Sequence, residues 1–563
     1  MAYDLVIRNG TLVDGTGADP VPADVAVEGD RIVAVGKVEG NAARTIDADG
    51  CLVTPGFIDI HTHLDAQVFW DPIVSSPCWH GVTSAVMGNC GVGFAPIRSE
   101  NREYFARLME SVEDIPTESI MEGLPWSWES FGDYLDAVQA LPKGINVGGM
   151  IGHCAVRYWT MGKRCLDQKH ASAEDIEKMR EVVAEAIDRG ALGFSTSRTL
   201  VHKTPDGEPI PGTFALPEEL LGIARALEQH QKGVFEVVPE VDSPDPAVHL
   251  SEIDWMTDVC LETGRPLTFA LIQVQQLPDI WEAVLEKVEQ ASARGANLRP
   301  QTQVRSVGVL FGLVNLTPFD SAGGSWGLLK LSSFEDRLAA LRNPEARKKL
   351  IEDAENCAFP AKVIGNFNLL PIENGEARYD MRPENRLAAI AERRGVGLAE
   401  AFIDLTLETD GRVLFFYPFA NQDLGAVSQM LKHPQMILGL ADSGAHCGQI
   451  MDASLPTFLL SYWVREKGHF SLAEAIRKLT SEPAEIFDLK GRGVVREGAF
   501  ADLNVIDFEA LRVREPRYVQ DFPAGAFRYT QRGDGYRHTI VNGQPFMENG
   551  EHTGALAGTL LRS

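Results

Sequence analysis

The sequence predicts an α/β protein, a (β/α)8 or TIM barrel with a small β-sandwich domain built from both ends of the chain. Over most of the 563 residues, short apolar segments alternate with amphipathic helices, which is typical of parallel strands joined by helices. Both ends of the chain carry short strands with Gly and Asn turns instead. The region between them is long enough for eight strand–helix units.

Residues 1–55 and 490–563 form the predicted β-sandwich domain. At the start, "DLVIR" predicts a strand, and "DVAVEGDRIVAVG" predicts a hairpin around its Glu-Gly-Asp turn. Near the other end, "ADLNVID" and "RHTIVNGQPFMENG" show the same pattern. Neither end has enough apolar positions for a core of its own, so we expect the two ends to pair with each other.

Residues 56–489 form the predicted barrel. Amphipathic helices are expected at 172–190 and 217–233, where apolar residues recur at spacings of three and four residues and a Gly stands at the end. A doubly wound open sheet is the alternative, but no GxGxxG follows the first strand. The predicted strands are "GFIDIHTH", "GVTSAVMGNCG", "INVGGMIGH", "GALGFSTS", "GVFEVVPE", "RPLTFALIQ", "NLRPQTQV", "RVLFFYP" and "MILGLADSG".

Residues 310–400 are longer than an ordinary connection between a strand and a helix. Their Trp, Phe and Pro content indicates an insertion or lid that folds over one end of the barrel. We expect this segment to set substrate specificity.

Composition excludes several classes of protein. The net charge is −27 without a run of Lys or Arg, which disfavours a nucleic-acid partner. The eight cysteines are scattered without a CxxC pair, as expected in a reducing cytoplasm. The N-terminus lacks the apolar core of a signal peptide, and no stretch approaches the ~20 apolar residues that span a bilayer. We expect a cytoplasmic protein with no membrane partner, and its composition is compatible with a homo-oligomer.

His61 and His63 stand where the apolar segment "GFIDI" ends. In a barrel, functional groups lie at the carboxyl ends of the strands. Residues two apart on a strand point to the same side, so both imidazoles can bind one cation. A pair of loop histidines is the alternative, since this pattern alone occurs often by chance.

The context of this pair resembles a known family. "TPGFIDIHTHLD" after a β-rich segment is similar to the amidohydrolase superfamily of metal-dependent barrel hydrolases. "TSEPAEIFDLKGRGVVREGAFADLNVID" resembles that superfamily's return into its β-sandwich. "MGNCGVGFAP" and "VNGQPFMENGEHTGALAGTLLR" resemble the N-acyl-D-amino-acid deacylase (D-aminoacylase) branch. The resemblance extends over both ends and most of the barrel.

The resemblance implies a site. It makes His61 and His63 the metal ligands of the first strand, and Cys90 a zinc ligand where most relatives use a carboxylated lysine. It makes Asp442, which ends the last strand, a residue that touches the metal and acts as general base and then general acid. The alternatives are an inert buried cysteine and an aspartate that caps the next helix.

The sequence departs from the family at the two strands that we count as the fourth and fifth, "GVFEVVPEV" and "RPLTFALIQVQQ". Relatives place a metal-binding histidine at the end of each, and neither stretch contains one. Glu236 lies two residues before one of the expected positions. Its two interpretations are a metal ligand and the ion-pair partner of an arginine. Gln273 lies about two beyond the other, and His249 follows too late to substitute. We therefore expect one or two Zn²⁺ ions per chain, or another divalent metal.

Weaker candidates for substrate binding are His153 and Arg157 after the third strand, Arg305 after the sixth, and His446. An arginine fork suits a substrate carboxylate or an oxyanion. Ion pairs and simple loop positions are the alternatives. Ser195 is expected to serve a backbone turn, and no GxSxG or phosphate-loop pattern appears.

The predicted function is hydrolysis of the amide bond of a small N-acyl amino acid or related amide. A metal-activated water would attack the acyl carbon, with Asp442 as the proton shuttle. Hydrolysis of a cyclic amide, or of another non-peptide C–N or C–O bond, is the alternative on the same metal frame. A non-catalytic binding protein with a degenerated site is less favoured, because four metal-site positions are kept.

Overall fold

The computed structural model describes residues 3–167, 170–320, 323–355 and 365–563, and its centre is a parallel barrel. The hydrogen-bonded order of the eight strands follows the chain, and a parallel bridge between Thr62 and Ser443 closes the ring. The predicted (β/α)8 barrel is thus confirmed. Its strands are β6 (Phe57–Thr62), β7 (Val82–Met87), β8 (Asn146–Gly152), β9 (Gly193–Ser197), β10 (Val234–Val238), β11 (Leu267–Ala270), β12 (Leu298–Thr302) and β18 (Ile437–Leu438).

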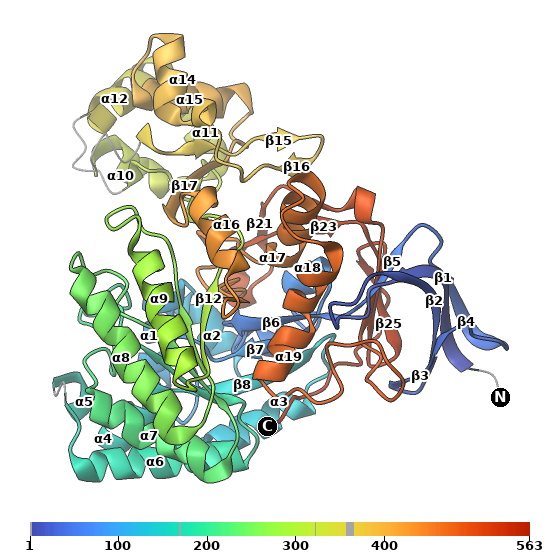
Figure 1. Cartoon of the computed structure of the whole chain (residues 1–563). Coiled ribbons are helices and arrows are strands. Elements are labelled where there is room, and N and C mark those ends of the chain that lie inside the picture. Colours follow the sequence, from blue (N-terminus) through green and yellow to red (C-terminus); the bar gives the residue numbers. More distant parts are fainter. Residues whose placement is uncertain (1–2, 168–169, 321–322, 356–364) are drawn as a thin grey trace.

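Amphipathic helices cover the outside of the barrel, and α6 to α9 follow one another along one flank (Figure 1). Helix α6 (Ala173–Asp188) starts with a capping box between Ser172 and Asp175 and turns Met179, Val183 and Ile187 inward. The other helices of the barrel region are α1 (Arg102–Glu113), α2 (Thr117–Gly123), α3 (Phe131–Ala140), α4 (His153–Met161), α5 (Arg164–Asp167), α7 (Pro217–His230), α8 (Pro246–Thr263), α9 (Ile280–Ala293), α16 (Leu424–Lys432), α17 (Leu455–Phe458), α18 (Leu472–Leu479) and α19 (Ser481–Ile486).

Both ends of the chain contribute to one nine-stranded sheet. Strand β5 pairs antiparallel with β19, which places Val53 opposite Val505, and both side chains are buried. The predicted hairpin forms as β2 and β3. The strands are β1 (Tyr3–Leu12), β2 (Val21–Glu28), β3 (Arg31–Gly36), β4 (Ala42–Asp47), β5 (Leu52–Pro55), β19 (Leu503–Ile506), β24 (Tyr536–Val541), β25 (Gln544–Glu548) and β26 (Glu551–His552). We retain 1–55 and 490–563 as the proposed extent of this domain.

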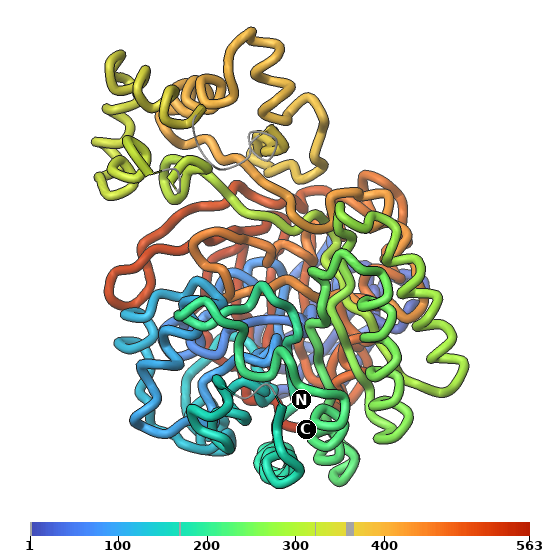
Figure 2. Tube along the Cα trace, turned by 90° about the vertical axis from the view of Figure 1, so that its left-hand side faces the viewer, coloured from blue at the N-terminus to red at the C-terminus, as the bar shows by residue number. Residues whose placement is uncertain are grey.

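The segment that connects the seventh and eighth barrel strands in the chain forms a separate body at one end of the barrel (Figures 1 and 2). Its antiparallel strands β13 (Val307–Phe311) and β17 (Phe415–Ala420) bring its two ends together, and β14 (Asn368–Leu369) pairs with β17. We call this body the insertion. It leaves from the carboxyl end of β12, so it lies on the face where β-strand ends present functional groups. Its helices are α10 (Gly324–Lys330), α11 (Phe334–Arg342), α12 (Pro344–Glu355), α14 (Leu387–Arg394) and α15 (Leu398–Glu408).

The insertion has its own hydrophobic core. Trp326 and Phe402 are both 0% exposed there, and they pack with Phe319. The predicted range 310–400 falls on this body, apart from residues 321–322 and 356–364, which lie outside the described residues.

Two expectations about the strands are wrong. Residues 412–418 were predicted as a barrel strand, but β17 pairs with β13 and β14 in the small sheet of the insertion. Phe415 and Phe416 are buried in that sheet, so an apolar run alone does not distinguish a strand of the insertion from a barrel strand. In addition, β9 is the fourth barrel strand, so β10 and β11 are the fifth and sixth, and Arg305 follows the seventh.

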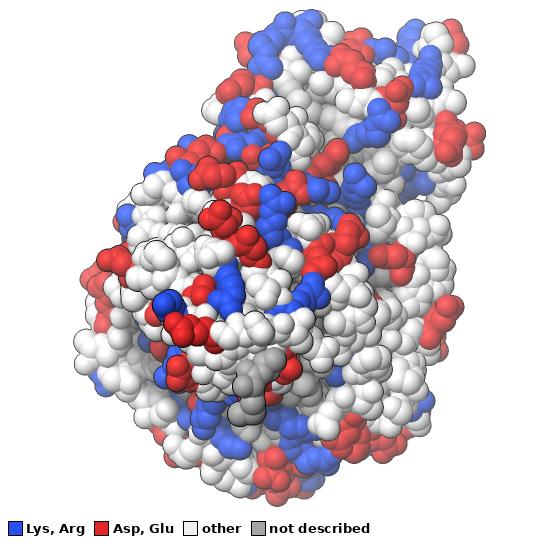
Figure 3. All heavy atoms as spheres, turned by 90° about the vertical axis from the view of Figure 1, so that its right-hand side faces the viewer, with Lys and Arg blue, Asp and Glu red and all other residues white. Residues whose placement is uncertain are grey.

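Charges of both signs are interspersed over the described residues of the face shown in Figure 3. This face therefore offers a mixed surface rather than a basic stripe of the kind that binds nucleic acid. None of the helices in the described residues is long and apolar enough to cross a membrane.

The core of the insertion predicts a local response to mutation. Replacing Trp326 with alanine removes a buried ring whose Nε1 donates a 2.9 Å hydrogen bond to the Leu350 carbonyl. We expect this change to destabilise the insertion by about 3–5 kcal/mol. Hydrogen exchange should accelerate in residues 313–320, 323–355 and 365–415, while the amides of the barrel strands keep their protection. Leu331→Ala, at a position that is 84% exposed, is the control and should change neither. Equal loss of protection in the barrel would contradict a separate core.

Candidate metal centre

Three side chains meet at the carboxyl ends of the first two barrel strands. The ligand atoms of His61, His63 and Cys90 all lie within 4.8 Å of one another, and all three residues are buried. Cys90 Sγ lies 3.2 Å from His61 Nε2 and 3.7 Å from His63 Nε2. Two imidazoles and a thiolate are ligands that Zn²⁺ prefers. The structure thus brings together the three residues predicted from the first and second strands.

The fourth predicted residue, Asp442, lies beside this cluster. Its Oδ1 is 3.2 Å from His61 Nε2 and 3.9 Å from His63 Nε2, and its side chain is 21% exposed. Its backbone N–H donates to the His61 carbonyl at 3.1 Å. Asp442 therefore faces the same point as the cluster and also faces solvent.

The backbone at the site adopts unusual conformations. Cys90, Asp442 and His446 have φ of 56°, 46° and 48°, in the left-handed region that non-glycine residues seldom occupy. Gly91 follows Cys90 because a Cβ there would lie 2.9 Å from the Thr196 Cα. Such outliers cluster at functional sites, where the surrounding fold holds them in place.

Each histidine has a partner on its second ring nitrogen. His61 Nδ1 lies 3.1 Å from the Gln301 Oε1, and His63 Nδ1 lies 3.2 Å from the Glu113 Oε1. A metal-ligating histidine needs such an acceptor to fix its tautomer and ring orientation. Both Nε2 atoms are thereby left to face the cluster.

Glu236, the uncertain ligand, is fully buried on β10. Its Oε2 accepts a 2.9 Å hydrogen bond from the Cys90 backbone N–H, and its Oε1 lies 3.9 Å from His61 Nδ1. The alternative of an arginine partner is not seen among the described residues. Glu236 thus holds the backbone of Cys90 and keeps one oxygen without a hydrogen bond.

Burial keeps the imidazoles neutral. It lowers the pKa of His61 to about 4, and it holds the pKa of His63 well below the usual range. Neutral imidazole is the form that binds a metal.

Burial disfavours the charged forms of the acidic groups, an effect that a bound cation would offset. Burial raises the pKa of Asp442 to about 6 and that of Glu236 to about 8. It also raises the pKa of the Cys90 thiol well above its usual range, and the nearby Glu236, Glu113 and Asp442 add to that shift. Coordination to a divalent metal is the kind of interaction that deprotonates such a thiol.

One buried oxygen also fits a metal. Asp442 Oδ1, 3.2 Å from His61 Nε2, accepts no hydrogen bond from any described residue. Unsatisfied buried oxygens are costly unless an ion or water meets them. The residues present therefore fit a divalent cation at this point.

Two of the predicted substrate-binding residues lie in a buried ion-pair cluster. His153 Nε2 is 3.0 Å from Glu219 Oε1, and Arg157 Nε is 3.0 Å from the same oxygen. His153 Nδ1 also contacts Thr196 Oγ1 at 2.8 Å. The structure does not bring this pair to the histidine–cysteine cluster, and their role in substrate binding stays a prediction.

Arg305 is likewise internal. Its Nη2 lies 2.9 Å from Asp452 Oδ1 and donates to the Met451 carbonyl, and the guanidinium stacks over the Tyr379 ring at 3.9 Å. Its predicted contact with substrate also stays a prediction. By contrast, His446 lies beside the cluster with a side chain that is 31% exposed.

Gln273 and His249 have structural partners elsewhere. Gln273 Oε1 accepts from the Asp423 backbone at 3.2 Å, and His249 Nε2 lies 2.9 Å from the Ser243 carbonyl. Neither supplies the histidine that is absent from β10 and β11.

Sequence reasoning missed three residues near the centre. Gln301 lies on a predicted strand, where an inward polar residue was a usable signal. Glu113 ends α1, and His202 contacts Ser197 Oγ at 2.9 Å. A helix end and a loop gave no signal that these two would reach the site.

The centre is closely packed. A cavity of about 20 Å³ lies beside Asp442, between Ser443, Asp452 and Tyr529.

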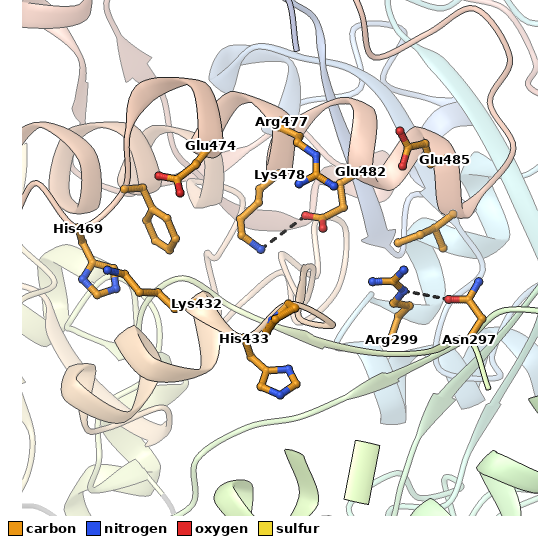
Figure 4. Close-up of a pocket in the computed structure, with 13 residues that line it drawn as sticks. Asn297, Arg299, Lys432, His433, His469, Glu474, Arg477, Lys478, Glu482 and Glu485 are labelled. Carbon is orange, nitrogen blue, oxygen red and sulfur yellow. Dashed lines mark hydrogen bonds and ion pairs between the residues drawn. The ribbon is translucent and has the colours of Figure 1, made fainter. Parts of the chain in front are cut away.

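A larger cavity, of about 660 Å³, lies at the opposite end of the barrel, where β12 and β18 begin (Figure 4). Acids and bases both line it, and Lys478 pairs with Glu482 at 3.6 Å. Its position at the amino ends of the strands separates it from the cluster.

A model of the amidohydrolase family matches residues 44–366 and 372–547, so the chain belongs to that family. The resemblance noted in the sequence is confirmed, and the protein is an enzyme of the amidohydrolase class.

Its relatives include deacylases. The chain is 28% identical to a D-aminoacylase of Alcaligenes xylosoxydans xylosoxydans, covering 99% of this chain and 97% of that protein. An N-acyl-D-glutamate deacylase of the same organism is 27% identical, covering 96% and 93%.

Solved structures share the fold. A D-aminoacylase crystal structure gives a TM-score of 0.68 at 24% identity, with both chains covered completely. An N-acyl-D-glutamate deacylase of Bordetella bronchiseptica, in complex with zinc and a phosphonate inhibitor, gives 0.67 at 23%, also with complete coverage of both chains.

The cluster predicts a cysteine-dependent metal site. Cys90→Ser replaces the soft ligand, so we expect the variant to lose most of its Zn²⁺ on dialysis, while the wild type keeps about one ion per chain. Elemental analysis of the dialysed proteins measures this. Cys78→Ser is the matched control, since Cys78 is equally buried and lies outside the cluster. Full zinc content in Cys90→Ser would rule out the thiolate as a ligand.

Proposed function

We propose that this enzyme is a metal-dependent hydrolase of the amide bond in a small N-acylated amino acid or a related amide. The convergence of His61, His63 and Cys90 within 4.8 Å, at the carboxyl ends of barrel strands, carries the proposal. The deacylase relatives support the choice of an acylated amino acid as the substrate class.

His61, His63 and Cys90 would hold the metal, with Asp442 beside them. A bound divalent metal would polarise the amide carbonyl and acidify a water molecule. Zn²⁺ suits two imidazoles and a thiolate. A single ion is the simpler expectation, because β10 and β11 carry no histidine ligand. One solved D-aminoacylase is described as having a binuclear centre with one-metal activation and second-metal attenuation.

Asp442 is the proposed proton shuttle. Its carboxylate faces both histidine Nε2 atoms and is partly exposed, so it can take a proton from an attacking water on the solvent side. The same carboxyl group would then deliver that proton to the leaving amine nitrogen. Its left-handed backbone and its hydrogen bond to the His61 carbonyl hold it in place for both steps.

The substrate would approach from the side of Asp442 and His446, where the site is exposed. The insertion touches this side, because the Leu310 backbone N–H donates to the Gln449 carbonyl at 2.7 Å. Asn315 Nδ2 also donates to the Gly448 carbonyl at 3.1 Å. We propose that the insertion forms part of the substrate-binding wall and selects the acyl group or the amine.

The proposal predicts loss of turnover without loss of fold. Asp442→Asn removes the proton shuttle, so we expect kcat/KM to fall by about 10²–10⁴-fold. A panel of N-acyl-D-amino acids, N-acyl-L-amino acids and hydantoins, assayed before and after EDTA, tests this. Activity in the wild type should disappear with EDTA and return with Zn²⁺.

Asp423→Asn is the control for this experiment. Asp423 caps α16 at its N-terminus and lies outside the cluster, so its variant should keep activity. Undiminished turnover in Asp442→Asn would overturn the mechanism. Turnover of hydantoins alone would instead favour a cyclic amide as the substrate.

A further inference from the structure

A buried carboxylate stands next to the metal centre without being part of it. Glu113 is 1% exposed, and its Oε1 lies 3.2 Å from His63 Nδ1. Its Oε2 lies 3.7 Å from His446 Nε2. Among the described residues, no group makes a hydrogen bond to either oxygen, and these two contacts are its nearest ion-pair contacts. The two histidines are therefore the partners that its position offers.

The orientation of the His63 ring explains how the contact with Glu113 can act on the metal centre. Its Nε2 faces Cys90 Sγ at 3.7 Å and Asp442 Oδ1 at 3.9 Å, while its Nδ1 faces Glu113 on the opposite side of the ring. A neutral imidazole that binds a metal through one nitrogen carries its proton on the other and needs an acceptor there. Glu113 Oε1, 3.2 Å from that nitrogen, is the oxygen placed to serve as this acceptor.

The backbone, and not the carboxylate, places Glu113 at this point. Glu113 is the last residue of α1, and its carbonyl accepts a hydrogen bond from the His446 backbone N–H. The next residue, Asp114, accepts from the Gly448 N–H at 3.1 Å and from Gln449 Nε2 at 3.2 Å. These bonds attach the end of α1 to the loop that carries Asp442. The position of residue 113 should therefore survive removal of its carboxylate.

The two histidines of the cluster have unlike acceptors. His61 faces the neutral amide of Gln301, whereas His63 faces the carboxylate of Glu113. A carboxylate on the second nitrogen raises the basicity of an imidazole ligand more than a neutral oxygen does. Removing the oxygens of residue 113 should weaken metal binding, because the ring of His63 would lose the group that orients it.

We infer that Glu113 is a positioning residue of the metal centre, which fixes the ring of His63 and links it to His446. The inference rests on the proposed function only in that His63 holds the metal. It concerns the affinity for the metal and does not depend on which amide is cleaved.

Zinc affinity tests the inference directly. Zn²⁺ is titrated into metal-free protein in competition with a chromophoric chelator, with no substrate present. We expect Glu113→Ala to bind Zn²⁺ about 10–100-fold more weakly than the wild type, as is typical when such a partner is lost. Glu113→Gln keeps the shape and an oxygen acceptor, so its loss should be smaller. The absorption of the Co²⁺-loaded proteins reports whether the ligand geometry changes as well.

Glu110→Gln is the matched control. It removes an exposed carboxylate one turn earlier on α1 and leaves Glu113 and its backbone contacts in place, so zinc affinity should stay close to that of the wild type. An equal loss in Glu110→Gln would show a general effect of the helix end and would overturn the inference. Wild-type affinity in both Glu113→Ala and Glu113→Gln would do so too. If Glu113→Ala fails to fold, Glu113→Leu, which fills the space without offering an acceptor, decides in its place.

The two proposals can fail separately. If the wild type binds Zn²⁺ and cleaves no amide, the proposed function fails and the zinc titrations still test Glu113. If the wild type cleaves an amide and the Glu113 variants hold Zn²⁺ as tightly, only the role of Glu113 is lost.

Discussion

The closure of the barrel is the constraint on which the rest of the structure depends. The first strand meets the segment after the eighth through His63 N–H to the Ser443 carbonyl at 2.8 Å, and through Asp442 N–H to the His61 carbonyl at 3.1 Å. The residues that close the ring are also residues of the proposed metal centre. Because the backbone direction of a strand fixes where its side chains point, ring closure and site assembly are one event. The site is therefore as rigid as the barrel.

The same closure gathers groups that repel one another or resist burial. Asp59, Glu236, Glu113 and Asp442 all have raised pKa values, and burial is the largest cause in each. Two neutral imidazoles and an uncharged thiol stand among them. In a low-dielectric interior the charged forms of these groups are unfavourable, so without a cation burial holds them uncharged. A divalent ion bound here would let the acids ionise, and its binding would add to the stability of the fold.

The sequence was most informative where local pattern and tertiary position agree. Short apolar strands identified the barrel and placed His61 and His63 at a strand end, whereas Cys90 and Asp442 were selected through the resemblance to the amidohydrolase superfamily. The pattern misled at 412–418, since an apolar strand of the insertion has the same composition as a barrel strand. Glu113 could not be found, because it ends an acidic amphipathic helix and resembles a surface residue. Hydrogen bonds from Gly448 and Gln449 to the Asp114 carboxylate, and from the His446 N–H to the Glu113 carbonyl, bring it to the site. These bonds join segments far apart in the chain.

The placement of the insertion between β12 and β18 has a consequence for how the protein is made. His61, His63 and Cys90 leave the ribosome early, whereas the strand that closes the ring follows the whole insertion. The insertion has its own core and forms from local contacts, while closure by β18 joins residues distant in sequence and comes late. Until then the nascent chain carries the Cys90 thiol and two imidazoles without Asp442. Any metal binding that uses all four residues should accordingly depend on completion of the barrel.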